Sequence, residues 1–130
     1  MTRLSLAFFA TAAVCAIGGM LWGIEMGVTD NLTLAPAHAH LNLVGWTSLA
    51  LMGGFYALAG DRVSQRVGWI NYILSTAGVI VMIPSLAILL STTNKVNPGI
   101  IVGSILVLLG MIVFLAAILS VWRTARPGQA

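Results

Sequence analysis

The chain has 130 residues, of which 59% are hydrophobic and only 7% are charged, and its mean hydropathy is +1.03. This composition excludes a soluble globular domain, because such a chain lacks the polar surface to cover itself, and it is typical of a membrane protein. The net charge of +3 would raise the question of nucleic-acid binding in a soluble protein, but the basic residues of a lipid-embedded chain report its topology instead. No Walker-type loop and no HExxH, G-x-S-x-G or CxxC motif is present, so nothing indicates phosphoryl transfer, hydrolysis or thiol redox chemistry.

The first apolar run extends from about residue 4 to residue 28 and follows the basic residue Arg3. Its length is about twice that of the hydrophobic region of a signal peptide, so we expect a transmembrane helix. Gly19, Gly23 and Gly27 recur at every fourth position within this run. Such a stripe of small residues lets another helix, or a flat cofactor, approach the backbone closely, and close helix packing is the commoner reason for it.

Three further apolar runs follow, separated by short polar connections. They cover about residues 36–60, 68–91 and 98–122. Each run is about 22 to 25 residues long, which at 1.5 Å per residue spans a hydrocarbon core about 30 Å thick. Pro84 lies within the third run and removes one backbone hydrogen bond, so we expect a kink there. The sequence therefore predicts a single all-α domain over residues 1–130, folded as an antiparallel four-helix transmembrane bundle.

The basic residues indicate the orientation of the helices. With four spans the two termini lie on the same side of the membrane, and five basic residues share that side: Arg3, Arg62, Arg66, Arg123 and Arg126. Lys95 alone lies on the other side, so the positive-inside rule places both termini in the cytoplasm of a multi-pass protein of a bacterial inner membrane. His38 and His40 then lie close to the outer face.

Both histidines of the chain lie at the start of the second run, in the segment Pro36-Ala37-His38-Ala39-His40. Proline favours the first turn of a helix, and helical residues two apart point about 200° apart around the axis. His38 and His40 are therefore expected on opposite faces, where they cannot clasp one metal ion together, because that requires a spacing of three or four. Two sites, one on each face, fit this spacing better. Without such a role, the histidines cap the helix end or meet lipid headgroups.

The residues that follow the histidines extend this pattern. His38-Ala39-His40, then Gly45-Trp46, then Gly53-Gly54-Phe55-Tyr56, resemble the tenth transmembrane helix of the catalytic subunit of heme-copper oxidases and nitric oxide reductases, particularly the C-type oxidases. In that family the first histidine binds the high-spin heme and the second binds the low-spin heme, so the resemblance implies these roles for His38 and His40. The family's subunit looks like three successive arcs of four helices. The whole chain would resemble one of these arcs.

The chain departs from the family in what it lacks. It has no further histidine, so the ligands that hold copper beside the high-spin heme are missing, as is the second ligand of the low-spin heme. We therefore do not expect oxygen or nitric oxide reduction by this chain alone, and whether it is an enzyme stays open. A ring of identical chains, trimeric by analogy with the three arcs, would restore a six-coordinate heme by placing His40 of one protomer opposite His38 of its neighbour. Two axial imidazoles suit electron transfer, so this reading favours a heme-b protein in electron transfer or redox support.

Two other classes of protein remain open. A copper or other metal carrier would use the two histidines with Met20 or Met26 at the outer face, and Glu25 could hydrogen-bond a ligating imidazole. An accessory subunit without a cofactor would dock its glycine stripe on a larger respiratory complex. Asn42 lies one turn after His38, where its amide could meet a heme propionate or the backbone of another helix. We place Asn42 with the two histidines among the candidate cofactor-binding residues.

Overall fold

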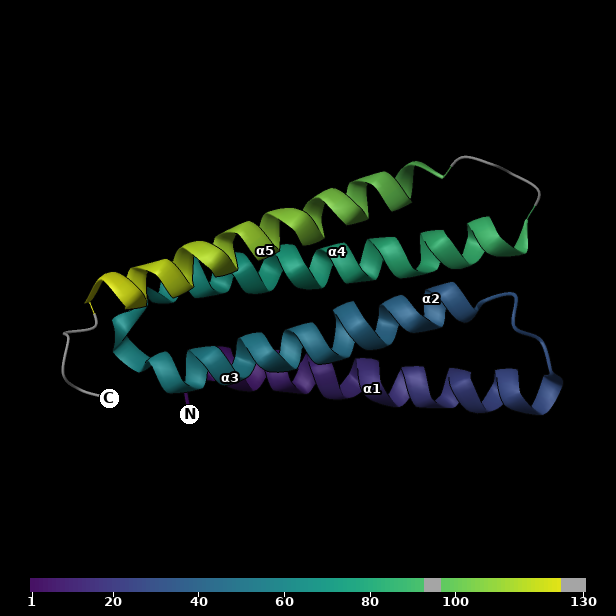
Figure 1. The fold of residues 1–130 in the computed structure, drawn as a ribbon, viewed down its shortest axis with the longest axis horizontal. Helices are drawn as coiled ribbons and strands as arrows, with labels where there is room; N and C mark the ends of the chain where they lie inside the picture. The colour runs from purple at the N-terminus through teal and green to yellow at the C-terminus, as the bar shows by residue number, and fades with distance from the viewer. Residues whose placement is uncertain (93–96, 125–130) are drawn as a thin grey trace.

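The computed structural model describes residues 1–92 and 97–124, and within these ranges it contains helices and no strand. Four helical segments are long and apolar enough to cross a membrane, and each runs opposite to the one before it (Figure 1). The spans are Arg3–Thr29, Ala35–Arg62, Gln65–Ser91 and Pro98–Arg123. The predicted all-α architecture with four candidate membrane spans is therefore confirmed. Two residues used for the topology prediction, Lys95 and Arg126, lie outside the described ranges.

Three of the spans are single α-helices, named α1 (Arg3–Thr29), α4 (Gln65–Ser91) and α5 (Pro98–Thr124). Helix α1 begins where the Thr2 hydroxyl accepts a hydrogen bond from the backbone N–H of Ser5 at 3.2 Å, which satisfies a donor at the helix N-terminus. It ends at Asp30, whose φ of 53° lies in the left-handed region, where a right-handed helix cannot continue. Helix α4 continues through Pro84 without a break.

The second span is not one regular helix, and this corrects the expectation of a uniform helix over residues 36–60. It consists of α2 (Ala35–His40), the π-helical segment η1 (Leu41–Ser48), α3 (Leu49–Ala59) and the short 3₁₀ turn η2 (Gly60–Arg62). The wider π turn pairs each N–H with a carbonyl five residues back instead of four.

Two hydroxyl groups follow the same spacing in η1. Thr47 Oγ1 donates to the carbonyl of Asn42 at 3.1 Å, and Ser48 Oγ donates to the carbonyl of Leu43 at 2.8 Å. Side chains that reach back along a helix in this way are associated with bends and with local changes of turn. The adjacent Thr47 and Ser48 are thus the sequence signal that accompanies the irregular segment.

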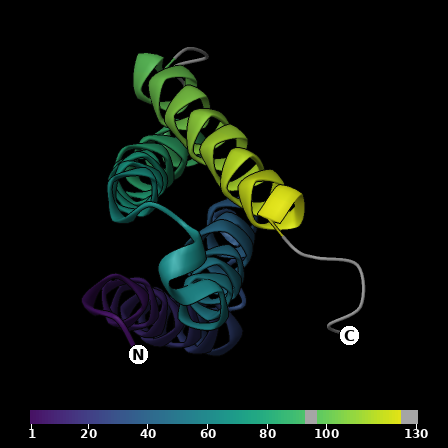
Figure 2. The ribbon, with the colours of Figure 1, turned by 90° about the vertical axis from the view of Figure 1, so that its left-hand side faces the viewer.

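The helices pack as two pairs. Helix α1 lies along the second span, whereas α5 packs mainly on α4 (Figures 1 and 2). Phe114 of α5 also meets the rings of Phe55 and Tyr56 on α3. Small residues bring α4 and α5 close together: a Cβ atom placed on Gly103 would lie 2.6 Å from the backbone N of Met82, and one placed on Gly78 would lie 2.8 Å from the backbone N of Val107. Helices inside a membrane associate through such close packing, because lipid supplies no hydrophobic driving force between them.

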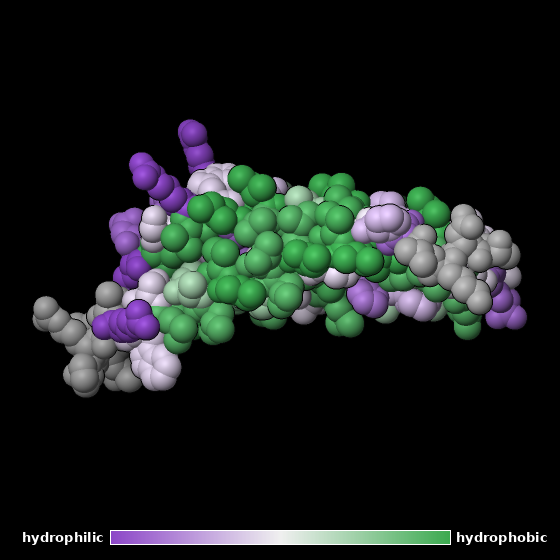
Figure 3. All heavy atoms as spheres, turned by 90° about the horizontal axis from the view of Figure 1, so that it is seen from above, coloured by the Kyte–Doolittle hydropathy of each residue, from purple (hydrophilic) through white to green (hydrophobic). Residues whose placement is uncertain are grey.

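The surface has the distribution expected of a membrane-spanning protein. Figure 3 shows a broad apolar band across the middle of the molecule and hydrophilic residues toward the two ends. On α5 the apolar side chains of Ile101, Ile105, Leu108, Ile112 and Leu115 are all exposed. Helix α5 is thus the least covered of the four spans.

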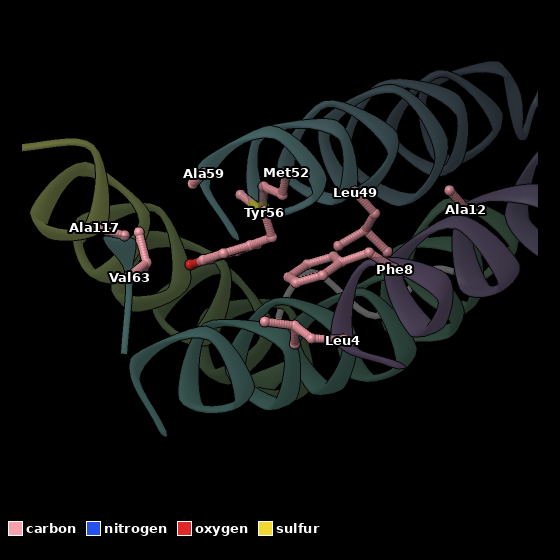
Figure 4. Close-up of a cluster of buried hydrophobic side chains, with 9 residues drawn as sticks. All are labelled: Leu4, Phe8, Ala12, Leu49, Met52, Tyr56, Ala59, Val63 and Ala117. Carbon is pink, nitrogen blue, oxygen red and sulfur yellow. The ribbon is translucent and has the colours of Figure 1, made fainter. Parts of the chain in front are cut away.

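The largest buried cluster lies in the half of the bundle that contains the N-terminus. Phe8 of α1 packs among Leu4, Leu49 and Tyr56 (Figure 4), and the rings of Phe8 and Tyr56 are stacked with centroids 5.5 Å apart. Polar bonds accompany this cluster: Asn71, which is fully buried, donates to the Tyr56 hydroxyl at 3.0 Å. The Asn71 side-chain oxygen in turn accepts a hydrogen bond from the Ser75 hydroxyl within α4. The bond between Asn71 and Tyr56 thus joins α4 to α3 through buried polar groups.

A methyl group on Gly103 should separate α4 from α5. We expect Gly103→Ala to lower the free energy of unfolding by about 1–3 kcal/mol, as overpacking does in well-packed cores. Gly27→Ala is the matched control, because a Cβ atom there meets nothing within 4 Å and alanine favours the helix. Thermal unfolding in detergent, followed by circular dichroism, measures both variants. Equal midpoints would contradict the close contact of the two backbones.

Candidate functional site

His38 points from α2 toward α1. A Cβ atom placed on Gly23 of α1 would lie 3.0 Å from Cε1 of the His38 ring, so the imidazole occupies the space that this glycine leaves. The side-chain nitrogen of Asn42 lies 3.3 Å from Nε2 and 3.5 Å from Nδ1 of the same ring. Because it is about equally far from both ring nitrogens, the amide does not single out one of them. His38 is thus enclosed on two sides by its own chain.

Asn42 also faces α1, one turn along from His38. Its Nδ2 donates to the His38 carbonyl at 3.0 Å, and a Cβ atom on Gly19 would lie 2.7 Å from that same nitrogen. Two glycines of the predicted stripe, Gly19 and Gly23, therefore make room for Asn42 and His38. The third, Gly27, is exposed and has nothing within 4 Å of its Cβ position. The stripe serves helix packing in the structure described, and the amide of Asn42 meets the backbone of its own helix.

His40 has different surroundings from His38, as the spacing of two predicts. Its Nδ1 donates to the carbonyl of Pro36 at 2.7 Å, since a carbonyl oxygen can only accept. The proton is thereby placed on Nδ1, and Nε2 keeps its lone pair. Metal-ligating histidines commonly make this second hydrogen bond, because it sets the tautomer and the orientation of the ring.

The His40 ring lines a hollow of about 340 Å³ between the second span and the α4–α5 pair. The other lining side chains are mainly apolar and come from η1, α4 and α5: Val44, Met82, Ser104, Val107, Leu108 and Met111. The four residues from α5 are spaced as one helix face, at i, i+3, i+4 and i+7. The hollow thus combines one imidazole with an apolar wall and two thioethers.

The methionines that line the hollow at His40 differ from the two named from the sequence. The predicted soft ligands Met20 and Met26 both lie on α1, where Met20 is 59% exposed and Met26 is buried. Neither lines the hollow at His40, whereas Met82 and Met111 do. The Sδ atom of Met82 accepts a hydrogen bond from the Ser104 hydroxyl at 3.6 Å. Sequence reasoning missed these two methionines, because only the folded chain brings α4 and α5 beside α2.

Acidic side chains add no ligands to the site. Glu25 is exposed, and the hydrogen bond described at this residue goes from the Thr29 hydroxyl to the Glu25 backbone carbonyl. Across residues 1–92 and 97–124 no group of three or more His, Cys, Asp and Glu side chains could hold a metal ion. To bind iron or copper, the described part of the chain would therefore need further ligating atoms, supplied by a cofactor such as a porphyrin, by methionine sulfurs or by a second chain.

A larger hollow of about 550 Å³ lies on another face, between α1 and the second span. Its walls are mostly apolar and aromatic, and they include Phe9, Trp46 and Phe55. The one hydroxyl in the wall, that of Thr47, already donates to the carbonyl of Asn42. Despite its size, this hollow offers no group that could ligate a metal or carry a proton, so we regard the smaller hollow at His40 as the candidate functional site.

No protein-family model, no curated protein and no solved structure matches this chain. The fold defines the class, a helical protein with four candidate membrane spans.

The contact between Gly19 and Asn42 can be tested by a double-mutant cycle. We expect Gly19→Ala to destabilise the protein, because the new methyl group meets the Asn42 amide. In the background of Asn42→Ala the same substitution should cost less, with a coupling of about 0.5–3 kcal/mol. Unfolding midpoints of the four proteins give this coupling. Gly27→Ala combined with Asn42→Ala is the control and should be additive; additivity in both cycles would contradict the contact.

Proposed function

We propose that the chain is a heme-b-binding integral membrane protein that takes part in electron transfer or redox support, with His40 as an axial ligand. The observation that carries this proposal is the hydrogen bond from His40 Nδ1 to the Pro36 carbonyl at 2.7 Å, beside an apolar hollow. It leaves Nε2 with its lone pair, which is the form of imidazole that binds iron. The resemblance of residues 38–56 to the heme-binding helix of heme-copper oxidases supports the same ligand.

The residues at the hollow suit a heme. A large apolar macrocycle needs apolar side chains against its faces, and Val44, Val107 and Leu108 supply them beside His40. A heme supplies one-electron redox chemistry at its iron, and with two axial ligands it leaves no coordination position open to a gas. The protein's part is to hold the ring nitrogen in place and to set apolar side chains against the macrocycle.

His38 and Asn42 take another part in this proposal. Both are packed against α1, at Gly23 and Gly19, and they lie on the side of α2 away from the hollow. For His38 to bind iron, its ring would have to leave the space at Gly23. We therefore propose that His38 and Asn42 position α2 against α1, and so hold His40 toward the hollow.

A cuprous ion is the second candidate ligand. Thioethers are soft ligands that favour Cu(I), and imidazole also binds copper. Met82 and Met111 line the same hollow as His40, which favours this alternative over the copper site at Met20 or Met26. The two candidates differ in what they predict: copper gives a metal stoichiometry without a Soret band, whereas heme gives both.

The heme proposal is tested by an absorption spectrum of the protein purified in mild detergent after expression with ample heme. We expect a Soret band and sharp bands on reduction with dithionite, and His40→Ala should abolish them because the iron loses its ligand. Leu58→Ala, an exposed position in the same span that does not line the hollow at His40, is the control and should keep the spectrum. A featureless spectrum of well-folded wild-type protein would overturn the proposal.

We also propose that the protein lies in a bacterial cytoplasmic membrane with both termini in the cytoplasm. Four arginines support this orientation, because they lie together at one end of the bundle (Figure 1). Helices α1 and α4 start at this end, and the second span and α5 finish there. The four arginines are Arg3, Arg62, Arg66 and Arg123. Basic residues near the ends of transmembrane helices concentrate on the cytoplasmic side.

Reporter fusions measure this orientation. A green fluorescent protein fused after residue 130 should fluoresce, because it matures in the cytoplasm. Alkaline phosphatase inserted after residue 32, in the connection that follows α1, should be active, because it folds only outside. An active phosphatase at the C-terminus would reverse the proposed topology.

A further inference from the structure

One chain can offer only one imidazole to an iron atom at the hollow. The chain has two histidines, and His38 lies on the opposite side of α2 from His40, because the two are separated by about 200° around the helix. His38 is also enclosed by its own chain, with Gly23 of α1 at its Cε1 edge and the Asn42 amide beside its ring. A neighbouring chain that approached His38 would have to displace α1.

The hollow at His40 also covers only one side of a heme. Its volume of about 340 Å³ is at the low end of the range of about 300–1,000 Å³ for sites that enclose small ligands. Two of its lining residues on α5 stay open to the surroundings, since Leu108 is 58% exposed and Met111 is 42% exposed. A porphyrin that lies against this wall keeps its other face uncovered by this chain.

We infer that the second axial ligand is His40 of a second copy of the chain, related to the first by a two-fold axis that passes through the iron. This inference rests on the proposed heme function. A two-fold axis brings the same surface of both copies together, so two identical hollows would cover the two faces of one heme. The arrangement uses the exposed histidine twice and leaves both His38 rings against α1. It differs from a three-fold ring, in which His38 and His40 of neighbouring chains would meet.

The rival within a single chain is a methionine of the same hollow. Met82 is buried, and its sulfur already accepts a hydrogen bond from Ser104. Met111 is more exposed and would be the intrachain ligand. A His40–Met111 pair would bind one heme per chain, whereas a His40–His40 pair binds one heme per two chains, so stoichiometry separates them.

The experiment measures heme and protein in the same detergent-purified sample, with heme quantified as its pyridine complex and the particle mass determined by light scattering. We expect 0.5 heme per chain on a dimer and the electron paramagnetic resonance signal of a low-spin, bis-imidazole iron. In His38→Gln and Met111→Leu the heme that is bound should keep this signal, because neither change removes an axial imidazole. His40→Ala should lose the heme. If His40→Ala does not fold, His40→Met replaces it as the test: this variant keeps a ligand to the iron, and its reduced spectrum should be shifted from that of the wild type.

A mixed dimer gives a second readout. Co-expressed wild-type and His40→Ala chains with different affinity tags can be purified as the heterodimer, which has one axial imidazole instead of two. Its heme should become high-spin and should bind carbon monoxide in the reduced state, whereas the wild-type dimer should not.

The outcomes distinguish this inference from the proposed function. One heme per chain that is lost in Met111→Leu would overturn the shared site and keep the heme function. Loss of heme in His38→Gln, with a trimeric particle mass, would favour the ring of three. Absence of heme from folded wild-type protein would overturn both.

Discussion

The close approach of helix backbones at glycine residues is the contact on which the rest of this structure depends. Lipid chains are as apolar as leucine, so helices in a membrane are held together by packing and by polar bonds between them. Gly103 and Gly78 let α4 and α5 meet along their backbones. On α1, Gly19 and Gly23 instead leave space for the side chains of Asn42 and His38. The same type of residue therefore sets the fold in one pair of helices and the orientation of the histidines in the other.

The orientation of α2 gives two chemically identical residues different roles. His38 fills the space at Gly23, and its nitrogens lie near the Asn42 amide, so it acts as a packing residue in the structure described. His40 lies beside a hollow, and its Nδ1 proton is committed to the Pro36 carbonyl. A ring nitrogen that keeps its lone pair is able to ligate a metal, and the proposed heme site rests on this property. The surroundings of each ring therefore distinguish the two histidines.

The π-helical segment joins the candidate site to the buried core. It begins directly after His40 and ends directly before Leu49, which belongs to the cluster around Phe8. Such segments are rare and often occur at functional sites. Here the hydroxyl groups of Thr47 and Ser48 bond to carbonyls five residues back, which matches the spacing of the wider turn. The wider turn changes the angle around the helix axis between the side chains before it and those after it. His40 therefore lies beside the hollow, while Tyr56 lies in the buried cluster around Phe8.

The amino-acid sequence by itself determined the class of fold, because four apolar runs of membrane-spanning length leave little choice, and the observed spans begin and end close to the predicted residues. It also determined that His38 and His40 lie on opposite sides of one helix, since this follows from the helical repeat alone. Only the tertiary structure decided which side faces α1 and which faces the hollow with Met82 and Met111. The reason is that helices far apart in the sequence supply these neighbours, and no local pattern records how two helices pack.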